Sequence, residues 1–159
     1  MHFPTTLRPM IAADLASPEG LVESSDRVEV VARRMVDERL AGLAVVGGDG
    51  RPLAVLPAPQ VLGLAVPTYV KDDPSLAGIV DQAMSDRMGE RLRSLTVQDV
   101  LDDAERDLLA TVAHDATLLE VAAIMARLQT PLLVVVAADG GALGTVNVRD
   151  VLQAVLPSP

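Results

Sequence analysis

The sequence contains no cysteine, no tryptophan and only two aromatic residues, Phe3 and Tyr69. The absence of cysteine excludes disulfides, thiolate catalysis and cysteine-based metal sites, and it suits a reducing compartment. The near absence of aromatic rings removes the stacking platform on which single-strand nucleic-acid binders place bases. We therefore expect a cytoplasmic protein with no cysteine chemistry and no base-stacking surface.

Positive charge and long apolar runs are also scarce. Lys and Arg number 13 against 22 Asp and Glu, so the formal net charge of −9 argues against nucleic-acid and anionic-membrane partners. The longest apolar run, 131–138, has the length of a strand and not that of a membrane span. Residues 1–10 lack the apolar core of a signal peptide, so we expect no secretion signal.

What the sequence does contain is an internal repeat. Residues 20–62 align with residues 110–152 at an offset of ninety without a gap, and 12 of 43 positions are identical. The matches include Met35 with Met125 and Asp49 with Asp139. Half of the residues are apolar, which is far from the disordered class and sufficient for a core. The chain is thus predicted to be a duplication of one small unit.

Each copy reads β-α-β-β-α. Apolar residues at helical spacing, such as Leu118, Val121 and Met125, predict a helix after the first strand. Glycine-rich turns at 47–50 and 139–141 predict hairpins. The expected strands are 21–23, 43–46 and 53–56 in the first copy and 109–113, 132–136 and 143–147 in the second, with final helices from Ala58 and Val148. One face of each sheet would remain uncovered, so we predict an α/β (α+β) fold in which two units pack sheet to sheet.

The stretch between the copies has no counterpart in the repeat. Residues 66–74 contain two prolines and are interpreted as a loop, and residues 75–93 as an amphipathic helix with Leu76, Ile79, Val80 and Leu92 on one side. Short related elements, 12–15 and 97–100, precede the first strands. We predict a first repeat at 8–66, an insertion at 67–93 and a second repeat at 94–157.

The unit resembles the CBS (cystathionine-β-synthase) domain, and the whole chain resembles a stand-alone CBS pair. The residues that carry the resemblance are the lead-in 96–101, the hairpin 135–140 and the final motif 144–152, which reads Gly-Thr-Val-Asn-Val-Arg-Asp-Val-Leu. Only Asn147 departs from the final motif of the family, which has Ser or Thr there. The first copy has lost the Gly, the Ser or Thr and the Asp of that motif, with Pro57 and Gln60 at the last two of these positions.

The resemblance implies two clefts related by pseudo-twofold symmetry, which in this family bind adenine nucleotides or related adenosyl ligands such as S-adenosylmethionine. Asp150 would accept the ribose hydroxyls, and Asn147 would partly replace the missing hydroxyl. The expected ligand-binding residues of this cleft are Asp150, Asn147, Thr145, Gly144, Ile11, Leu40 and Ala41. The second cleft would use Gln60 and Pro57 opposite Thr96, Thr130 and Pro131, and we expect it to be empty or altered.

Simpler interpretations stand beside these. Asp150 is also the kind of residue that helix dipoles favour in a first turn, and Asn147 is a common helix cap. No catalytic constellation is visible, so we expect no enzyme, no metal and no resident cofactor. We predict a regulatory sensor that binds an adenosyl ligand in one cleft, forms a homodimer and acts on a regulated protein; the alternative is a degenerate, ligand-free CBS dimerisation or protein-interaction module.

Overall fold

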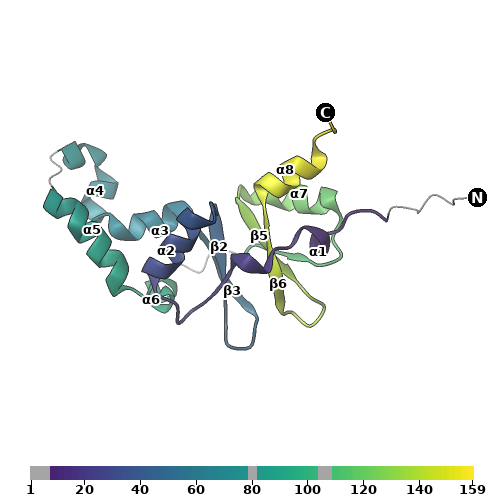
Figure 1. The fold of residues 1–159 in the computed structure, drawn as a ribbon, viewed down its shortest axis with the longest axis horizontal. Coiled ribbons are helices and arrows are strands. Elements are labelled where there is room, and N and C mark those ends of the chain that lie inside the picture. The colour runs from purple at the N-terminus through teal and green to yellow at the C-terminus, as the bar shows by residue number, and fades with distance from the viewer. Residues whose placement is uncertain (1–7, 79–81, 104–108) are drawn as a thin grey trace, which may run out of the picture.

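Two three-stranded sheets lie side by side in the middle of the molecule, and the helices cover their outer sides (Figure 1). The structure, a computed structural model, describes residues 8–78, 82–103 and 109–159. The first sheet contains β1 (Leu21–Glu23), β2 (Gly42–Val46) and β3 (Pro52–Pro57), and the second contains β4 (Thr111–Ala113), β5 (Leu132–Val136) and β6 (Ala142–Asn147). In each sheet the first strand pairs in parallel with the second, which pairs antiparallel with the third. The predicted α/β fold is confirmed.

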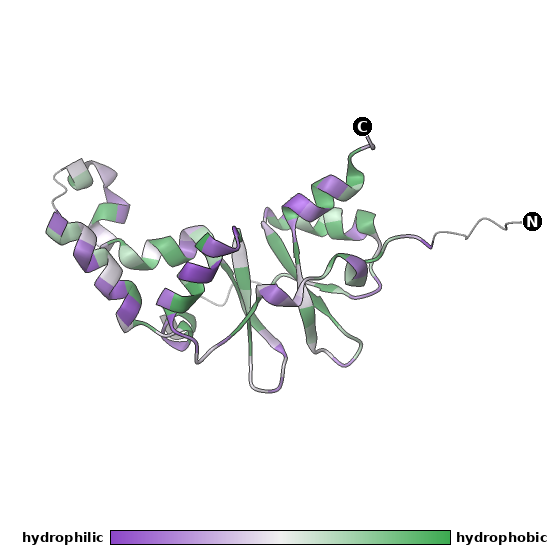
Figure 2. Cartoon of the chain, viewed as in Figure 1, coloured by the Kyte–Doolittle hydropathy of each residue, from purple (hydrophilic) through white to green (hydrophobic). Residues whose placement is uncertain are grey.

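The helices of each repeat follow the same plan. The helices are α2 (Val28–Asp37) and α3 (Ala58–Ala65) in the first repeat, and α7 (Leu118–Leu128) and α8 (Val148–Val155) in the second. Val121 and Met125 are buried on α7, as their spacing predicted, and Thr117 and Glu120 form a capping box at its start. Figure 2 shows apolar strands and helices with both polar and apolar faces, the pattern of a sheet with a one-sided helical cover.

The hairpins end in glycines with a backbone conformation that other residues rarely adopt. Gly50 has φ 78° and Gly140 has φ 87°. The two hairpins also touch, because Arg51 donates to the Asp139 carbonyl at 3.0 Å and the Ala142 amide donates to the Gly50 carbonyl at 2.9 Å. The tips of the two repeats are therefore joined.

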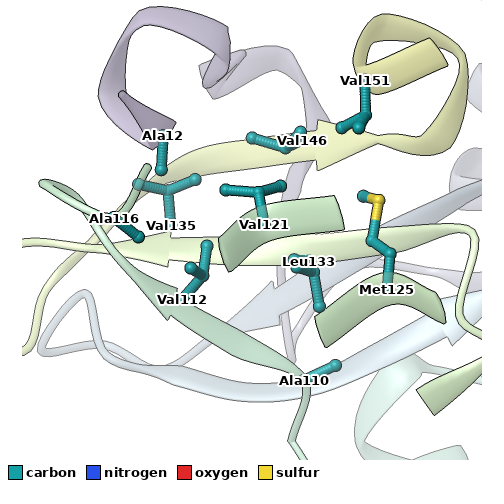
Figure 3. Packing of buried hydrophobic residues seen from close by; sticks show 10 residues of the cluster. All are labelled: Ala12, Ala110, Val112, Ala116, Val121, Met125, Leu133, Val135, Val146 and Val151. Carbon is teal, nitrogen blue, oxygen red and sulfur yellow. The ribbon is translucent and has the colours of Figure 1, made fainter. Parts of the chain in front are cut away.

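The lead-in element of each repeat packs on the other repeat. Helix α1 (Ala12–Leu15) places Ala12, which is 0% exposed, in the core of the second sheet beside Val135 and Val146 (Figure 3). Helix α6 (Val97–Asp103) places Val97, also 0% exposed, in the core of the first sheet. The repeats therefore exchange these elements, and each core is completed by the other half of the chain.

Matched backbone hydrogen bonds hold the exchanged helices. The amide of Ala12 donates to the Ala116 carbonyl and that of Val97 to the Asp26 carbonyl, both at 2.9 Å.

Each of the two exchanged helices is capped by an aspartate. Hydrogen bonds from the Ile11 amide and from Arg8 lower the pKa of Asp14, and those from the amide and hydroxyl of Thr96 lower the pKa of Asp99. The two exchanged helices are thus held by equivalent contacts.

The insertion differs from its prediction. The expected loop contains a one-turn helix, α4 (Thr68–Asp72), because the Val70 and Lys71 amides both donate to the Pro67 carbonyl. The expected single helix is a 3-10 turn (Pro74–Gly78), started by hydrogen bonds from Ser75 to Asp73, and the longer α5 (Gln82–Ser94). Ile79 and Val80 lie outside the described residues. Helix α5 packs on α2 and α3 and covers part of the first repeat's helical face.

The substitution Gly42→Ala tests how closely the two sheets approach. A Cβ atom at Gly42 would collide with Leu132 of the second sheet and would lie 2.8 Å from the Leu56 carbonyl oxygen. Overpacking of this kind costs about 1–3 kcal/mol of unfolding free energy, which chemical denaturation would measure. The matched control is Gly63→Ala in α3, where no atom lies within 4 Å and helix propensity predicts up to about 1 kcal/mol of stabilisation. Equal stability of Gly42→Ala and the parent would contradict the close sheet contact.

Candidate functional site

Two clefts lie where the repeats meet, and their linings share five pairs of positions under the offset of ninety residues: 39 and 129, 40 and 130, 41 and 131, 145 and 55, and 147 and 57. The first cleft, with a volume of about 120 Å³, is lined by Arg39, Leu40, Ala41, Gly42, Leu132, Thr145, Asn147, Val148 and Arg149. The second cleft, of about 290 Å³, is lined by Val55, Pro57, Gln60, Ala110, Leu128, Gln129, Thr130 and Pro131. Each cleft therefore combines a helix end from one repeat with a strand-to-helix junction from the other.

Four of the predicted ligand-binding residues line the first cleft: Leu40, Ala41, Thr145 and Asn147. Leu40 and Ala41 follow α2, which ends where Arg39 takes the left-handed conformation with φ 54°. Thr145 and Asn147 lie at the end of β6, and the Val148 amide at the start of α8 donates to the Pro131 carbonyl at 2.8 Å. The ends of secondary structure elements fix all four in place.

Asp150 lies one hydrogen bond behind this lining. Its carboxylate oxygen Oδ2 accepts from Asn147 Nδ2 at 2.8 Å, and its backbone amide donates to Asn147 Oδ1 at 2.9 Å. Asn147 is therefore the N-cap of α8, as the simpler interpretation anticipated, and it also holds the Asp150 carboxylate. A carboxylate accepts about four hydrogen bonds, so Asp150 keeps acceptor capacity for a hydroxyl group.

Gly144 and Ile11 have structural positions outside the lining of the first cleft. A Cβ atom at Gly144 would lie 2.6 Å from the Ser17 carbonyl oxygen, so this glycine lets the segment after α1 approach β6. Ile11 pairs with Thr117 at the start of α1. Thr145, although it lines the cleft, is only 8% exposed and exchanges backbone hydrogen bonds with Ser17 at 2.9 Å. Ligand-binding roles for these residues stay predictions.

Two arginines that line the first cleft, Arg39 and Arg149, were not predicted from the sequence. Both side chains are exposed. Each adjoins a residue that was predicted, Leu40 in one case and Asp150 in the other. The signal that would have found them is charge: each is cationic where the other repeat has a neutral residue, Gln129 and Pro59.

The second cleft brings together Pro57, Gln60, Thr130 and Pro131, as the resemblance implied. Thr96 is not part of its lining, because its hydroxyl and amide cap α6 through Asp99. The Thr130 hydroxyl donates a hydrogen bond to the Leu132 carbonyl at 2.8 Å. None of the described residues that line this cleft is charged, although it is the larger of the two.

Two further features concern the described part of the chain. Within residues 8–78, 82–103 and 109–159, no group of three or more His, Asp or Glu side chains is placed to hold a metal ion. Over the same ranges, no helix has the length and apolar character needed to cross a bilayer.

The comparisons with known proteins agree with the fold. The model of the CBS domain matches residues 95–157, the second repeat. A CBS domain-containing protein of unknown function from Kribbella flavida is 37% identical, with a TM-score of 0.77, and the match covers 93% of this chain and 99% of that one. The CBS domain of a CBS domain-containing membrane protein from Sphaerobacter thermophilus is 23% identical with a TM-score of 0.68, covering 96% and 91%. CBSX2 from Arabidopsis thaliana, in complex with AMP, is 20% identical with a TM-score of 0.61, covering 91% and 95%. No curated protein matches the sequence.

Proposed function

Since the chain belongs to the CBS-domain family, we propose that it is a regulatory sensor module that binds an adenosyl ligand in the first cleft. The observation that carries the proposal is the asymmetry of the two clefts. Of the described residues, a carboxylate, that of Asp150, lies directly behind the lining of the first cleft and is joined to Asn147, whereas the equivalent residue of the second cleft is the neutral Gln60. Asp150 would accept the ribose hydroxyls. A complex of CBSX2 with AMP, a protein of the same fold, supports the choice of adenine nucleotides as the first ligands to test.

The chemistry of the site is binding without catalysis. The two ribose hydroxyls would donate to Asp150, and the charged acceptor would make these hydrogen bonds stronger than neutral ones. Leu40, Ala41 and Val148 supply apolar surface beside this point. Since the lining comes from both repeats, a bound ligand would tie the repeats together, which is how we expect the ligand to influence a regulated protein.

One observation favours the alternative, a ligand-free interaction module. The first cleft has a volume of about 120 Å³, whereas clefts that hold small ligands usually measure about 300–1,000 Å³. The side-chain amide of Asn147 also donates a hydrogen bond to one oxygen of the Asp150 carboxylate, Oδ2, and so uses part of its acceptor capacity. Nucleotide binding therefore requires the exposed side chains at the rim to move apart, or part of the nucleotide to lie outside the cleft.

A thermal-shift screen separates the two functions. The full chain would be melted with AMP, ATP, NAD and S-adenosylmethionine. A ligand present at a hundred times its dissociation constant stabilises the folded state by about 2.7 kcal/mol, a shift of several degrees for a chain of this size. We expect at least one of these ligands to raise the melting temperature. A flat response to all four would favour the ligand-free module.

We propose that the partner of this module is in the first place a second copy of the chain. An apolar groove of about 520 Å³ lies between α7 and α8, and none of the described residues that line it is charged. The equivalent helical face of the first repeat is partly covered by α5, where Arg91 Nε donates to the Leu64 carbonyl at 2.7 Å. Leu152 and Val155 line this groove and are exposed, and Leu156, which follows them, is exposed as well. The α7–α8 face therefore offers the contiguous apolar surface that a twofold contact between copies needs.

The substitution Leu152→Glu tests this dimer. Leu152 is 53% exposed, so a charge there would leave the fold intact and would disrupt an apolar contact between copies. We expect the parent to sediment as a dimer and Leu152→Glu as a 16.7 kDa monomer. The matched control is Leu62→Glu, the equivalent position on α3, which is 62% exposed and lies on the face that α5 partly covers. A parent chain that is monomeric at micromolar concentration would rule the dimer out.

A further inference from the structure

The insertion between the repeats forms a groove of its own. This groove, with a volume of about 500 Å³, lies where α4 and α5 meet the end of α3. Since the insertion has no counterpart in the second repeat, the groove is not a copy of either cleft. Figure 1 shows α4 and α5 at the end of the molecule away from α7 and α8, so the groove is separate from the α7–α8 face.

The insertion contributes little to the core. None of its described residues, 67–78 and 82–93, is fully buried. Leu92 packs against the core of the first sheet, and Lys71 and Arg91 donate to carbonyls at the end of α3. Ordering such a segment costs conformational entropy, which burial of apolar surface usually offsets. The second repeat folds without a segment of this kind, so the architecture does not require it.

The groove is lined by the types of side chain that are enriched at protein interfaces. Tyr69, Met84 and Met88 line it together with Arg87 and Arg91. Tyrosine offers a large rigid ring, methionine adapts its shape to a partner, and arginine offers a planar set of donors. Tyr69 is 56% exposed, although it is one of only two aromatic residues in the chain. This lining is therefore typical of a surface that contacts another protein.

The two arginines of the groove have donors to spare. No ion pair or hydrogen bond joins the Arg87 guanidinium to another residue that the structure describes. Arg91 uses Nε for the Leu64 carbonyl, which leaves its other N–H groups for a ligand. Together with Glu90, the acidic residue among the described lining, they give the lining a charge of +1, whereas the whole chain has −9. Such a site suits an acidic partner segment.

The arrangement of these side chains along α5 indicates the shape of the occupant. Met84 and Met88 are four residues apart, and so are Arg87 and Arg91, so an apolar row and a cationic row run side by side along the helix. From Met84 to Ser94 the helix rises about 15 Å. That length matches about three turns of a partner helix, which would place apolar and acidic side chains in rows of the same spacing.

We propose that this groove of the insertion is the docking site for an acidic amphipathic segment of the regulated protein. Apolar side chains of the segment pack on Tyr69, Met84 and Met88, and its carboxylates accept hydrogen bonds from Arg87 and Arg91. This inference rests on the part of the proposed function that assigns a regulated protein. It does not depend on the adenosyl ligand or on the dimer, because the groove lies outside both clefts and outside the α7–α8 face.

Selection from a phage-displayed library of random peptides against the full chain, without nucleotide, tests the proposal. A selected peptide is then synthesised, and fluorescence anisotropy measures its affinity for the parent and the variants. The groove variants are Arg87→Glu and Tyr69→Ala, both of which change an exposed side chain and leave the core intact. The matched control is Arg93→Glu, the same change of charge on the same helix, because Arg93 is 65% exposed and does not line the groove.

We expect the selected peptides to contain Asp or Glu beside apolar residues that are three or four positions apart. Arg87→Glu and Tyr69→Ala should each weaken binding by about tenfold or more, and Arg93→Glu should bind like the parent. Replacing the acidic residues of the peptide by Lys should abolish binding to the parent and restore part of the binding to Arg87→Glu. A purely structural effect of the substitution would not produce this exchange of specificity.

The opposite results are equally clear. Selected peptides without acidic residues, an affinity that neither groove variant changes, or the absence of any enriched peptide would overturn the docking site. Sedimentation of the variants tests a second copy as the occupant: if Arg87→Glu converts a dimer into a monomer, the groove holds another copy and the proposal is wrong. A failure of the adenosyl ligand is seen separately, in the thermal-shift screen, and would leave the docking site standing.

Discussion

Residues 1–70 expressed by themselves are expected to be unfolded or aggregated, although they contain a whole predicted repeat. Their core would lack Val97, which reaches the first sheet from α6 and is 0% exposed in the full chain. Their α1 would have no second sheet to cover, because Ala12 belongs to the other core. The faces of β2 and β3 that contact β5 would be open to water. Circular dichroism and sedimentation of the fragment would measure the outcome.

Co-expression of the two halves is the control for this prediction. The contacts between residues 1–70 and 71–159 are non-covalent, so the two fragments should associate into a complex that melts cooperatively. Recovery of the fold only in the mixture would show that the exchanged helices and the sheet contact are what the single half lacks. A soluble half that melts cooperatively by itself would refute the interdependence of the repeats.

Asp150→Ala is expected to weaken nucleotide binding by about ten- to a hundredfold. The substitution removes the charged acceptor for the ribose hydroxyls, and a hydrogen bond to a charged group contributes about 1.5–3 kcal/mol. If the ligand binds, it should bind once per chain, in the first cleft. Titration calorimetry of the parent and the variant would give both the affinity and the stoichiometry.

Gln60→Ala is the matched control, because Gln60 is the equivalent residue of the second cleft. It should leave binding almost unchanged, since that cleft lacks a carboxylate and has Pro57 where Asn147 stands in the other. Asp150 is half-buried and Gln60 is exposed, so both variants should remain folded, and their melting temperatures would verify this. Two equivalent sites would show that the second cleft also binds the ligand, and loss of binding on changing Gln60 and not Asp150 would show that the roles of the two clefts are reversed.

The local plan of each repeat could be predicted from the sequence because it depends on short-range patterns. Apolar periodicity located α7, the continuous apolar run gave β5 with its observed bounds, and the glycine turns gave both hairpins. The secondary structure of the insertion was harder to predict. A single helical turn such as α4 is held by hydrogen bonds to the carbonyl of Pro67 and is too short to show a periodic pattern of apolar residues. The offset of ninety residues also showed in advance which positions of the clefts are equivalent.

What the sequence by itself determined is the duplication and the order of the strands within each repeat. The placement of Leu40, Ala41, Thr145 and Asn147 at one cleft came from the resemblance to the CBS family. Only the tertiary structure decided that α1 and α6 exchange places between the repeats, since a four-residue helix such as α1 shows no preference in its sequence for one sheet over another. The same packing brought Arg39 and Arg149, which are 110 positions apart in the chain, to the lining of one cleft. Charge at a site depends on which residues meet in space, and periodicity along the chain contains no information about that meeting.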